Sequence, residues 1–183
     1  MSFSSLNLAH AIDPILQIAD SALLRPLKTE DISSNYIDSL NTPIVRKYLS
    51  TQGGSQYNNT NVTQFVLQND TASDCILFGF FVKGIHCGTC RLHDIRQQNS
   101  WLGLAIFDTT LWGQGWGRKI ITAVSNYALN QLQTEEVLAA IDPQNVGSQH
   151  AFAKSGFHVL VDEKLTRADG VITEIWQRKL NQG

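Results

Sequence analysis

The 183-residue chain has little of what marks several large classes of protein. It contains only three cysteines, and an odd count in a chain of this size argues against a disulfide framework. No apolar run approaches the roughly 20 residues of a membrane-spanning helix, and the first residues lack the basic patch and apolar stretch of a secretory signal. Lys and Arg number 14 against 16 Asp and Glu, which leaves no basic excess for a phosphate backbone or an anionic membrane. We therefore expect a cytoplasmic protein with free thiols and with neither nucleic acid nor membrane as its partner.

The spacing of Cys87 and Cys90 suggests a metal or redox site, but its surroundings argue against one. The segment is typical of a strand, in which residues three apart point to opposite faces. A second pair of ligands is also missing. We expect buried thiols and no metal.

A hydrophobic content of 43% over this length is enough for one substantial core, so we predict a single domain over residues 1–183. Residues 1–20 form an N-terminal extension in which the apolar residues from Ile12 to Ile18 have helical spacing. Next we predict a strand over 22–27 and helices over 29–40 and 44–49. They are followed by a glycine- and asparagine-rich mobile loop over 50–61 and by a helix that Thr60 caps and that ends near Gln68.

The pattern then changes to strands, predicted over 75–83, 86–95 and 100–108 as an antiparallel meander. A glycine-dense turn over 112–117 leads into a helix that ends near Leu132. We then predict a strand over 137–141 and a helix that Asn145 caps and that ends near Lys154. The chain ends with a hairpin of strands 157–161 and 172–178. The fold class is therefore α+β.

The glycine turn is the most informative element. Gly113, Gly115 and Gly117 allow a positive φ and a close approach of a ligand, and the helix that follows presents unpaired N–H groups at its positive end. Phosphate oxygens suit such a site, and Arg118 and Lys119 in the first turn add charge. The turn follows a meander and lacks the spacing of a dinucleotide fingerprint, and it lacks the Gly-Lys-Ser/Thr ending of a P-loop.

Two motifs in order resemble the GNAT superfamily, in particular its branch of ribosomal-protein and amino-sugar N-acetyltransferases. Trp-Gly-Gln-Gly-Trp-Gly at 112–117 is similar to the pyrophosphate turn of that family, and Asn-Val-Gly-Ser-Gln-His-Ala-Phe-Ala-Lys-Ser-Gly-Phe at 145–157 is similar to its second signature. The resemblance covers about Leu24 to Phe157. It implies a GNAT-like fold with a mixed, mostly antiparallel central sheet of six or seven strands flanked by helices.

The resemblance also implies acetyl-CoA as the cosubstrate of an N-acetyltransferase. Backbone amides of the turn would hold the pyrophosphate, the strand before it would pair with the pantetheine arm, and the second signature would contact that arm. The implied coenzyme A residues are Leu104, Ala105, Ile106, Phe107, Gln114, Gly115, Trp116, Gly117, Arg118, Lys119, Asn145, Ser148 and Phe152. For Asn145 a helix cap is an equally good role, and Trp116 and Phe152 also suit core packing.

The catalytic residues of the family have no clear counterparts in this sequence. A tyrosine that often protonates the thiolate would fall at Phe152, and the frequent acid would fall near Trp101, so neither is present. His93 and Asp94, which face Trp101 from the end of the neighbouring strand, are our leading candidates for the base, with a solvated hairpin end as the alternative. His86 and His150 are weaker candidates. Arg91 could contact an anionic group of the acceptor or form a surface salt bridge.

The resemblance implies a small-molecule or peptide amine as the acceptor, and an amino-sugar nucleotide, a protein N-terminus and a small amine all stay open. We expect a monomer or a homodimer. Two other functions stay open. A non-catalytic acyl-CoA-binding module would explain the missing tyrosine and acid, and a protein-interaction domain would reduce the glycines to a tight turn.

Overall fold

The computed structural model describes residues 14–49 and 55–180. In this part of the chain eight strands form one sheet in the order β1-β2-β3-β4-β5-β6-β8-β7. Neighbours pair antiparallel except β5 (Asn99–Ile106) and β6 (Glu136–Ile141), which run parallel. The predicted α+β class and the mixed, mostly antiparallel sheet are confirmed, with one strand more than the upper count.

The additional strand comes from the N-terminal extension, where the helix prediction is wrong. Residues 16–19 form β1 (Leu16–Ala19), which pairs antiparallel with β2 (Ala22–Pro26). The remaining edge of β2 offers unpaired amide and carbonyl groups, and four residues satisfy more backbone there than in an isolated helical turn. Ile12 and residues 50–54 of the predicted mobile loop lie outside the described residues, and residues 59–61 of that loop belong instead to α3.

Three helices follow β2, namely α1 (Ser34–Asn41), α2 (Pro43–Arg46) and α3 (Asn59–Thr71). A short 3₁₀ turn (Thr29–Asp31) precedes α1 and lies where the first helix was predicted to begin. The predicted cap of α3 is wrong by two residues. Asn58 caps it, because its side chain accepts from the Asn61 N–H while the Asn61 side chain accepts from the Asn58 N–H, which satisfies both amides.

The meander consists of β3 (Ile76–Val82), β4 (Ile85–His93) and β5, close to the predicted bounds. A 3₁₀ turn (Thr109–Leu111) and the glycine turn lead to α4 (Trp116–Asn130). After β6 come α5 (Val146–Ala153) and the hairpin of β7 (His158–Thr166) and β8 (Ile172–Lys179), whose first strand is longer than predicted. No helix among the described residues is long and apolar enough to cross a membrane.

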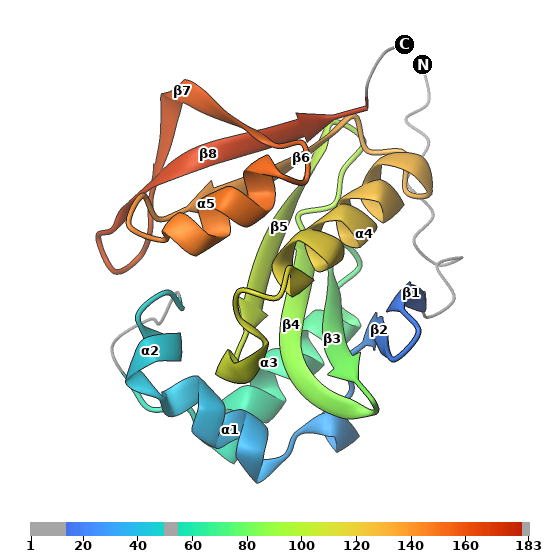
Figure 1. Cartoon of the computed structure of the whole chain (residues 1–183), viewed down its shortest axis with the longest axis vertical. Helices are drawn as coiled ribbons and strands as arrows, with labels where there is room; N and C mark the ends of the chain where they lie inside the picture. Colours follow the sequence, from blue (N-terminus) through green and yellow to red (C-terminus); the bar gives the residue numbers. More distant parts are fainter. Residues whose placement is uncertain (1–13, 50–54, 181–183) are drawn as a thin grey trace.

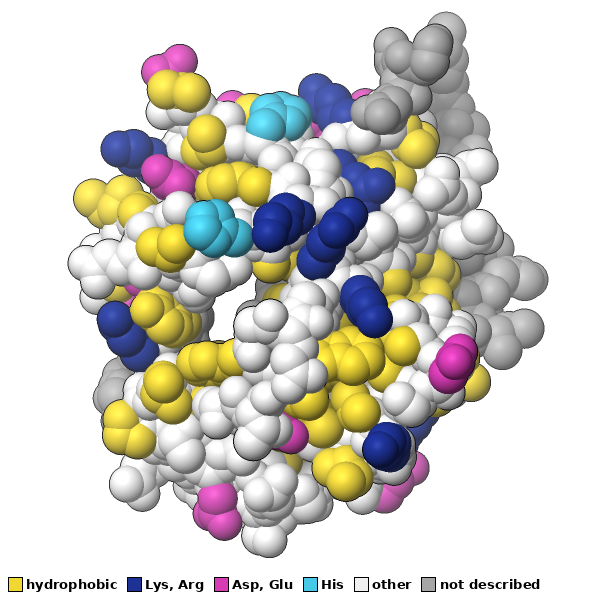
Figure 2. Space-filling view, in the orientation of Figure 1, with side chains coloured by type: hydrophobic (Ala, Val, Ile, Leu, Met, Phe, Trp, Pro, Cys, Tyr) yellow, Lys and Arg dark blue, Asp and Glu magenta, His cyan; other side chains and the backbone are white. Residues whose placement is uncertain are grey.

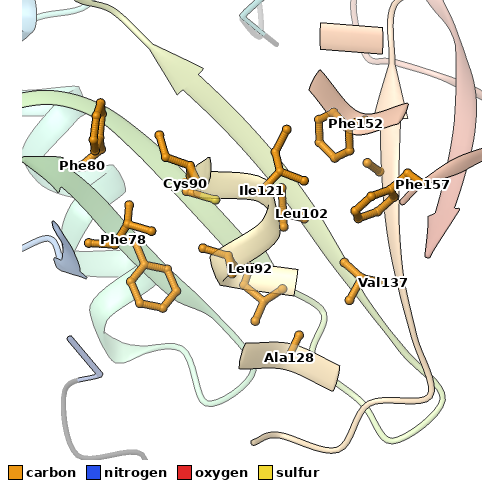
Figure 3. Close-up of a cluster of buried hydrophobic side chains, with 14 of the residues drawn as sticks. Phe78, Phe80, Cys90, Leu92, Leu102, Ile121, Ala128, Val137, Phe152 and Phe157 are labelled. Carbon is orange, nitrogen blue, oxygen red and sulfur yellow. The ribbon is translucent and has the colours of Figure 1, made fainter. Parts of the chain in front are cut away.

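The helices cover the two faces of the sheet unequally. Figure 1 shows α4 and α5 in front of the sheet and α3 behind it. The larger core lies between the sheet and α4, where Phe78, Cys90 and Ile121 are fully buried (Figure 3). The smaller core lies on the other face, where Val62 and Val66 of α3 pack with Phe81 and with Tyr36 of α1. We call these the α4 face and the α3 face.

All three cysteines are free and buried. Cys87 and Cys90 belong to the same core cluster, so the prediction of opposite faces is wrong. The pairing of β3 with β4 slips between Phe80 and Phe81, and Cys87 is the extra residue of this bulge. Burial raises the pKa of each thiol, which keeps it protonated and unreactive at neutral pH. Among the described residues no cluster of His, Cys, Asp and Glu could hold a metal ion.

Candidate active site

The central feature of the site is a split between the two parallel strands. β5 and β6 pair only from Asn99 to Trp101 and from Glu136 to Leu138. Beyond these residues β6 continues along β8 and β5 continues along β4, so their facing edges separate. The split therefore opens in the middle of the sheet.

The amides that point into the split follow from the register. The Phe107 N–H donates to Cys87 O on β4, and amide directions alternate along a strand. The amides of Ile106 and Leu104 therefore point away from β4 and into the split, whereas those of Ala105 and Phe107 point to β4. Of the four residues that the resemblance implied, only Leu104 and Ile106 can pair with an added strand, and the Phe107 side chain is buried in the smaller core.

The glycine turn lies at the open end of this split. Gly113 and Gly115 have φ of 74° and 82°, a conformation that L side chains rarely adopt, and a Cβ at either would meet nothing within 4 Å. The turn residues from Trp112 to Gly115 are exposed. Gly115 also caps α4 without a side-chain hydrogen bond, so the first amides of the helix are unpartnered and beside open space.

Gly117 has a different role, because its φ is ordinary and its surroundings are tight. A Cβ there would lie 3.4 Å from the Ala151 side chain and 3.7 Å from that of Leu104. The Ser155 hydroxyl donates to the Arg118 carbonyl from the end of α5. Gly117 thus lets α4 begin against both α5 and β5, which holds the turn next to the split.

Trp112 ties the turn to the strand, a contact that the sequence analysis missed. Its indole N–H donates to Ile106 O over 2.8 Å, and this carbonyl points into the split. Gln114 adds a second tie inside the turn, from its side-chain amide to Thr110 O at 2.7 Å. The Ile106 carbonyl consequently already has a hydrogen-bond partner in Trp112. The backbone groups left for a ligand are the Ile106 N–H and the N–H and carbonyl of Leu104.

Asn145 and Ser148 lie at the start of α5, where β6 ends. The Asn145 side-chain oxygen accepts from the Ser148 N–H at 3.1 Å, so the capping role is confirmed. The side-chain amide group of Asn145 and the Ser148 hydroxyl have no partner among the described residues. Both residues are half-buried.

Figure 2 shows the consequence of this arrangement in space. An opening passes through the molecule, and Lys and Arg side chains gather over α4 and α5 next to it. Arg118 and Lys119 are exposed in the first turn of α4, and the Lys119 ammonium lies 4.6 Å from the ring centre of Trp116. The rim on this side therefore combines free amides, the positive end of α4 and two cations.

On the α3 face, His93 faces Trp101 across β4 and β5, as predicted. Asp94 Oδ2 lies 2.7 Å from His93 Nδ1, so Nδ1 donates to the carboxylate and Nε2 is left as an acceptor. Burial and the nearby Arg91 charge lower the pKa of His93 against the opposing effects of Asp94 and Asp74. The ring is therefore neutral at pH 7, and its side chain is 27% exposed. This His-Asp pair lies where the split begins.

These features agree with the comparisons with known proteins. The sequence model described as acetyltransferase (GNAT) domain matches residues 22–158. The chain belongs to the GNAT acetyltransferase family.

Solved structures of this family have the same fold at low sequence identity. RimJ of Mycobacterium smegmatis in complex with CoA-disulfide is 14% identical, with a TM-score of 0.79 over 93% of this chain and 88% of RimJ. The ribosomal-protein-S5-alanine acetyltransferase of Vibrio fischeri is 16% identical, with a TM-score of 0.78 over 93% and 98%. AAC(6')-Ib in complex with paromomycin and acetyl-CoA is 16% identical, with a TM-score of 0.71 over 88% and 94%. No curated protein matches the sequence significantly.

Other residues named from the sequence have structural roles in this GNAT domain. Phe152 is buried and packs edge-on against Phe157 at 4.9 Å between ring centres (Figure 3). Trp116 packs on Phe80 at 5.5 Å between ring centres, and its buried indole N–H has no partner among the described residues. His86 is enclosed by aromatic rings, and this burial lowers its pKa to about 4, while His150 is exposed on α5.

Proposed function

We propose that this GNAT protein transfers an acetyl group from acetyl-CoA to a primary amine by direct attack, with both substrates bound at once. The observation that carries the proposal is the split between β5 and β6, which has the glycine turn on one face and the His93-Asp94 pair on the other. A site with two openings can bring two reactants together in the sheet.

The residues on the α4 face fit coenzyme A. The space beside Gly113 and Gly115 and the amides from Gln114 to Arg118 suit a pyrophosphate, with the Arg118 and Lys119 side chains adding charge. The Lys119 N–H, which the resemblance also implied, donates instead to Gly115 O within α4. The free backbone groups of Leu104 and Ile106 suit the amides of the pantetheine arm, and Asn145 and Ser148 lie beside its path. The CoA ligands in the solved structures of RimJ and AAC(6')-Ib support this assignment.

Acetyl-CoA, when bound, supplies the acetyl thioester. The Leu104 N–H is the first amide of β5 that points into the split beyond the paired segment. It is placed to donate a hydrogen bond to a carbonyl oxygen that gains negative charge, and a fixed amide needs no reorganisation to do so.

His93 is our proposed general base. An alkyl amine is mostly protonated at pH 7 and must lose a proton before it attacks. Nε2 is free to accept this proton, and Asp94 stabilises the imidazolium that forms. A strand rises about 3.3 Å per residue, so the Trp101 position lies roughly 10 Å along β5 from Leu104, a span that ordered water bridges. Phe152 has no proton to donate, so water protonates the departing sulfur.

The test is thiol release from acetyl-CoA with a panel of amines that includes amino sugars, small amines and peptide N-termini. Release that depends on one class of amine, together with loss of release in the His93→Gln variant, is the expected result. Thiol release that His93→Gln leaves intact would contradict the assigned base. We expect a 100-fold excess of coenzyme A over its Kd to stabilise the fold by about 2.7 kcal/mol.

A second candidate function is a non-catalytic acyl-CoA-binding module, which the buried Phe152 and the Trp101 position favour because neither offers a catalytic side chain. Tight binding of coenzyme A with no thiol release across the whole panel would select this function.

A further inference from the structure

The α3 face carries an uncovered strip beside the split. Val137, Ala139 and Ile141 of β6 point into the α4 core, so Leu138 and Ala140 face the other side, where Ala140 is exposed. On β5, Leu102 and Leu104 face α4, and Gly103 between them faces the same way as Ala140. We call Gly103 and Ala140 the open strip.

Gly103 has no structural need to be glycine. It is exposed, its φ is not in the left-handed region, and a Cβ built on it would meet nothing within 4 Å. A glycine inside a strand weakens it and often marks a place where a ligand approaches closely. The bare position lies at the acceptor side of the split, one residue before Leu104.

Phe65 of α3 borders this strip. The opposite flank of α3 faces the 3₁₀ turn after β2, because Asp70 pairs with Lys28, the residue before that turn, at 2.7 Å. Phe65 lies on the flank toward Arg91 of β4, and it is 40% exposed. Its ring stacks over the Arg91 guanidinium at 5.9 Å.

Arg91 is the cation beside the strip, directly across from Gly103 in the β4–β5 register. Its Nε donates to Asn69 Oδ1 at 2.6 Å, and this buried amide is itself fixed because its nitrogen donates to Phe65 O. The Cys75 thiol donates to the same Oδ1, and burial keeps that thiol neutral. Within the described parts of the chain, no carboxylate lies within ion-pair distance of Arg91, although Asp74 and Asp94 are in its neighbourhood.

The guanidinium is thus held through Nε by Asn69, with the neutral Cys75 thiol and the Phe65 ring beside it, and no carboxylate of the described residues pairs with its two terminal nitrogens. Such a fork binds a carboxylate or a phosphate through two parallel hydrogen bonds. We propose that the acceptor of this enzyme carries an acidic group, which Arg91 binds while the amine lies over Gly103 at the split. This inference rests on the proposed acetyl transfer and specifies its substrate class.

The experiment uses matched acceptors that differ in one charge. Glucosamine 6-phosphate is compared with glucosamine, and the dipeptide amide Ser-Glu with Ser-Gln, by the rate of thiol release from acetyl-CoA. We expect the acidic member of at least one pair to have a kcat/KM about 10- to 100-fold higher, chiefly through KM. The pair that shows the preference distinguishes a phosphate source from a carboxylate source.

The variants separate the charge of Arg91 from its packing. Arg91→Gln should reduce the preference to about one, Arg91→Lys should keep part of it, and Lys164→Gln on the exposed edge strand β7 should leave it unchanged. Unchanged coenzyme A affinity shows that each variant is folded. If Arg91→Gln does not fold, the test is the salt dependence of the wild type. Its preference for the acidic acceptor must then fall steeply with added salt, because salt screens the charge of Arg91.

Two results overturn the inference and stay distinct from failure of the proposed function. Thiol release with no preference for either acidic member, or an equal loss for both members in Arg91→Gln, contradicts the role of Arg91 while acetyl transfer stands. If the wild type releases no thiol at all, the proposed function fails. Calorimetry of the same acceptor pairs in the presence of coenzyme A then decides the inference, since equal binding of the charged and neutral members overturns it.

Discussion

The α4 face and the α3 face of the split are built from different kinds of groups. On the α4 face the site consists mainly of backbone amides of one short segment, from Leu104 to Lys119. On the α3 face it consists of side chains that come from α3, β4 and β5, such as Phe65, His93 and Trp101. A cosubstrate that all members of an enzyme family share can be bound by backbone amides, whose geometry does not depend on the side chains. Recognition of a particular acceptor needs side chains.

The largest expected effect comes from a substitution in the glycine turn on the α4 face. Gly115→Glu places a carboxylate against the proposed pyrophosphate site, and like charges in contact cost several kcal/mol, so we expect coenzyme A affinity to fall about a thousandfold. Calorimetry measures this loss. Gly170→Glu is the matched control, because Gly170 has the same φ of 82° and the same open surroundings in the β7–β8 turn. If both variants bind coenzyme A as the wild type does, the assigned site is wrong.

The next effect is on the α3 face and leaves the other face intact. His93→Gln removes the proposed base, and we expect kcat to fall about a hundredfold with coenzyme A affinity unchanged. Asp94→Asn should cost less, because it keeps the imidazole but loses the carboxylate that orients it. A loss of coenzyme A affinity in His93→Gln would show that the two faces are not separable.

The pH dependence has a definite sign. The pKa of His93 is lowered chiefly by burial, and then by Arg91, against Asp94 and Asp74, so Nε2 stays unprotonated through neutral pH. Activity should therefore hold at neutral pH and fall only as the pH drops through this lowered pKa, where the base becomes protonated. The profile of kcat/KM measures it. His93→Gln should abolish this acid limb, and an unchanged limb would assign it to another group.

A smaller effect sharpens the contrast between two tryptophans in the glycine turn. Trp112→Phe removes the hydrogen bond to Ile106 O that ties the turn to β5, and we expect coenzyme A to bind about 3- to 10-fold more weakly. Trp116→Phe should change affinity and stability little, because its indole N–H is buried without a partner. Equal losses in the two variants, measured by calorimetry and thermal unfolding, would contradict the role of Trp112.

The smallest effect concerns the tip of the β7–β8 hairpin, which we expect to border the acceptor. Arg167 pairs with Asp169 in this tip and donates to Leu49 O after α2, which joins two segments far apart in the sequence. Arg167→Gln should lower the free energy of unfolding by about 1 kcal/mol and raise the KM for the amine more than the affinity for coenzyme A changes. An unchanged KM would limit Arg167 to a structural role.

Several local errors of the sequence analysis have identifiable physical causes. The apolar residues from Ile12 to Ile18 have helical spacing, but the open edge of β2 makes a strand of residues 16–19 the better solution. Thr60 is a good capping residue, yet Asn58 caps α3 because it forms the reciprocal pair with Asn61. Cys87 was assigned to the wrong face because a bulge adds a residue to β4. The first and third outcomes depend on a neighbouring strand, whereas the cap of α3 depends on a pair of asparagines three residues apart.

The sequence by itself determined the family, the strand meander, the glycine turn and the Asn145 cap, because glycine at positive φ and a helix cap are local requirements that leave a local pattern. It also placed His93 opposite Trp101 at the end of the neighbouring strand. Only the tertiary structure decided which amides of β5 are free, that Trp112 occupies Ile106 O, and that Arg91 is oriented by Asn69 and Phe65 beside a bare Gly103. The contacts of Arg91 join residues far apart in the chain, and the geometry of all these contacts is set by the packing of α3 and α4 on the two faces of the split sheet.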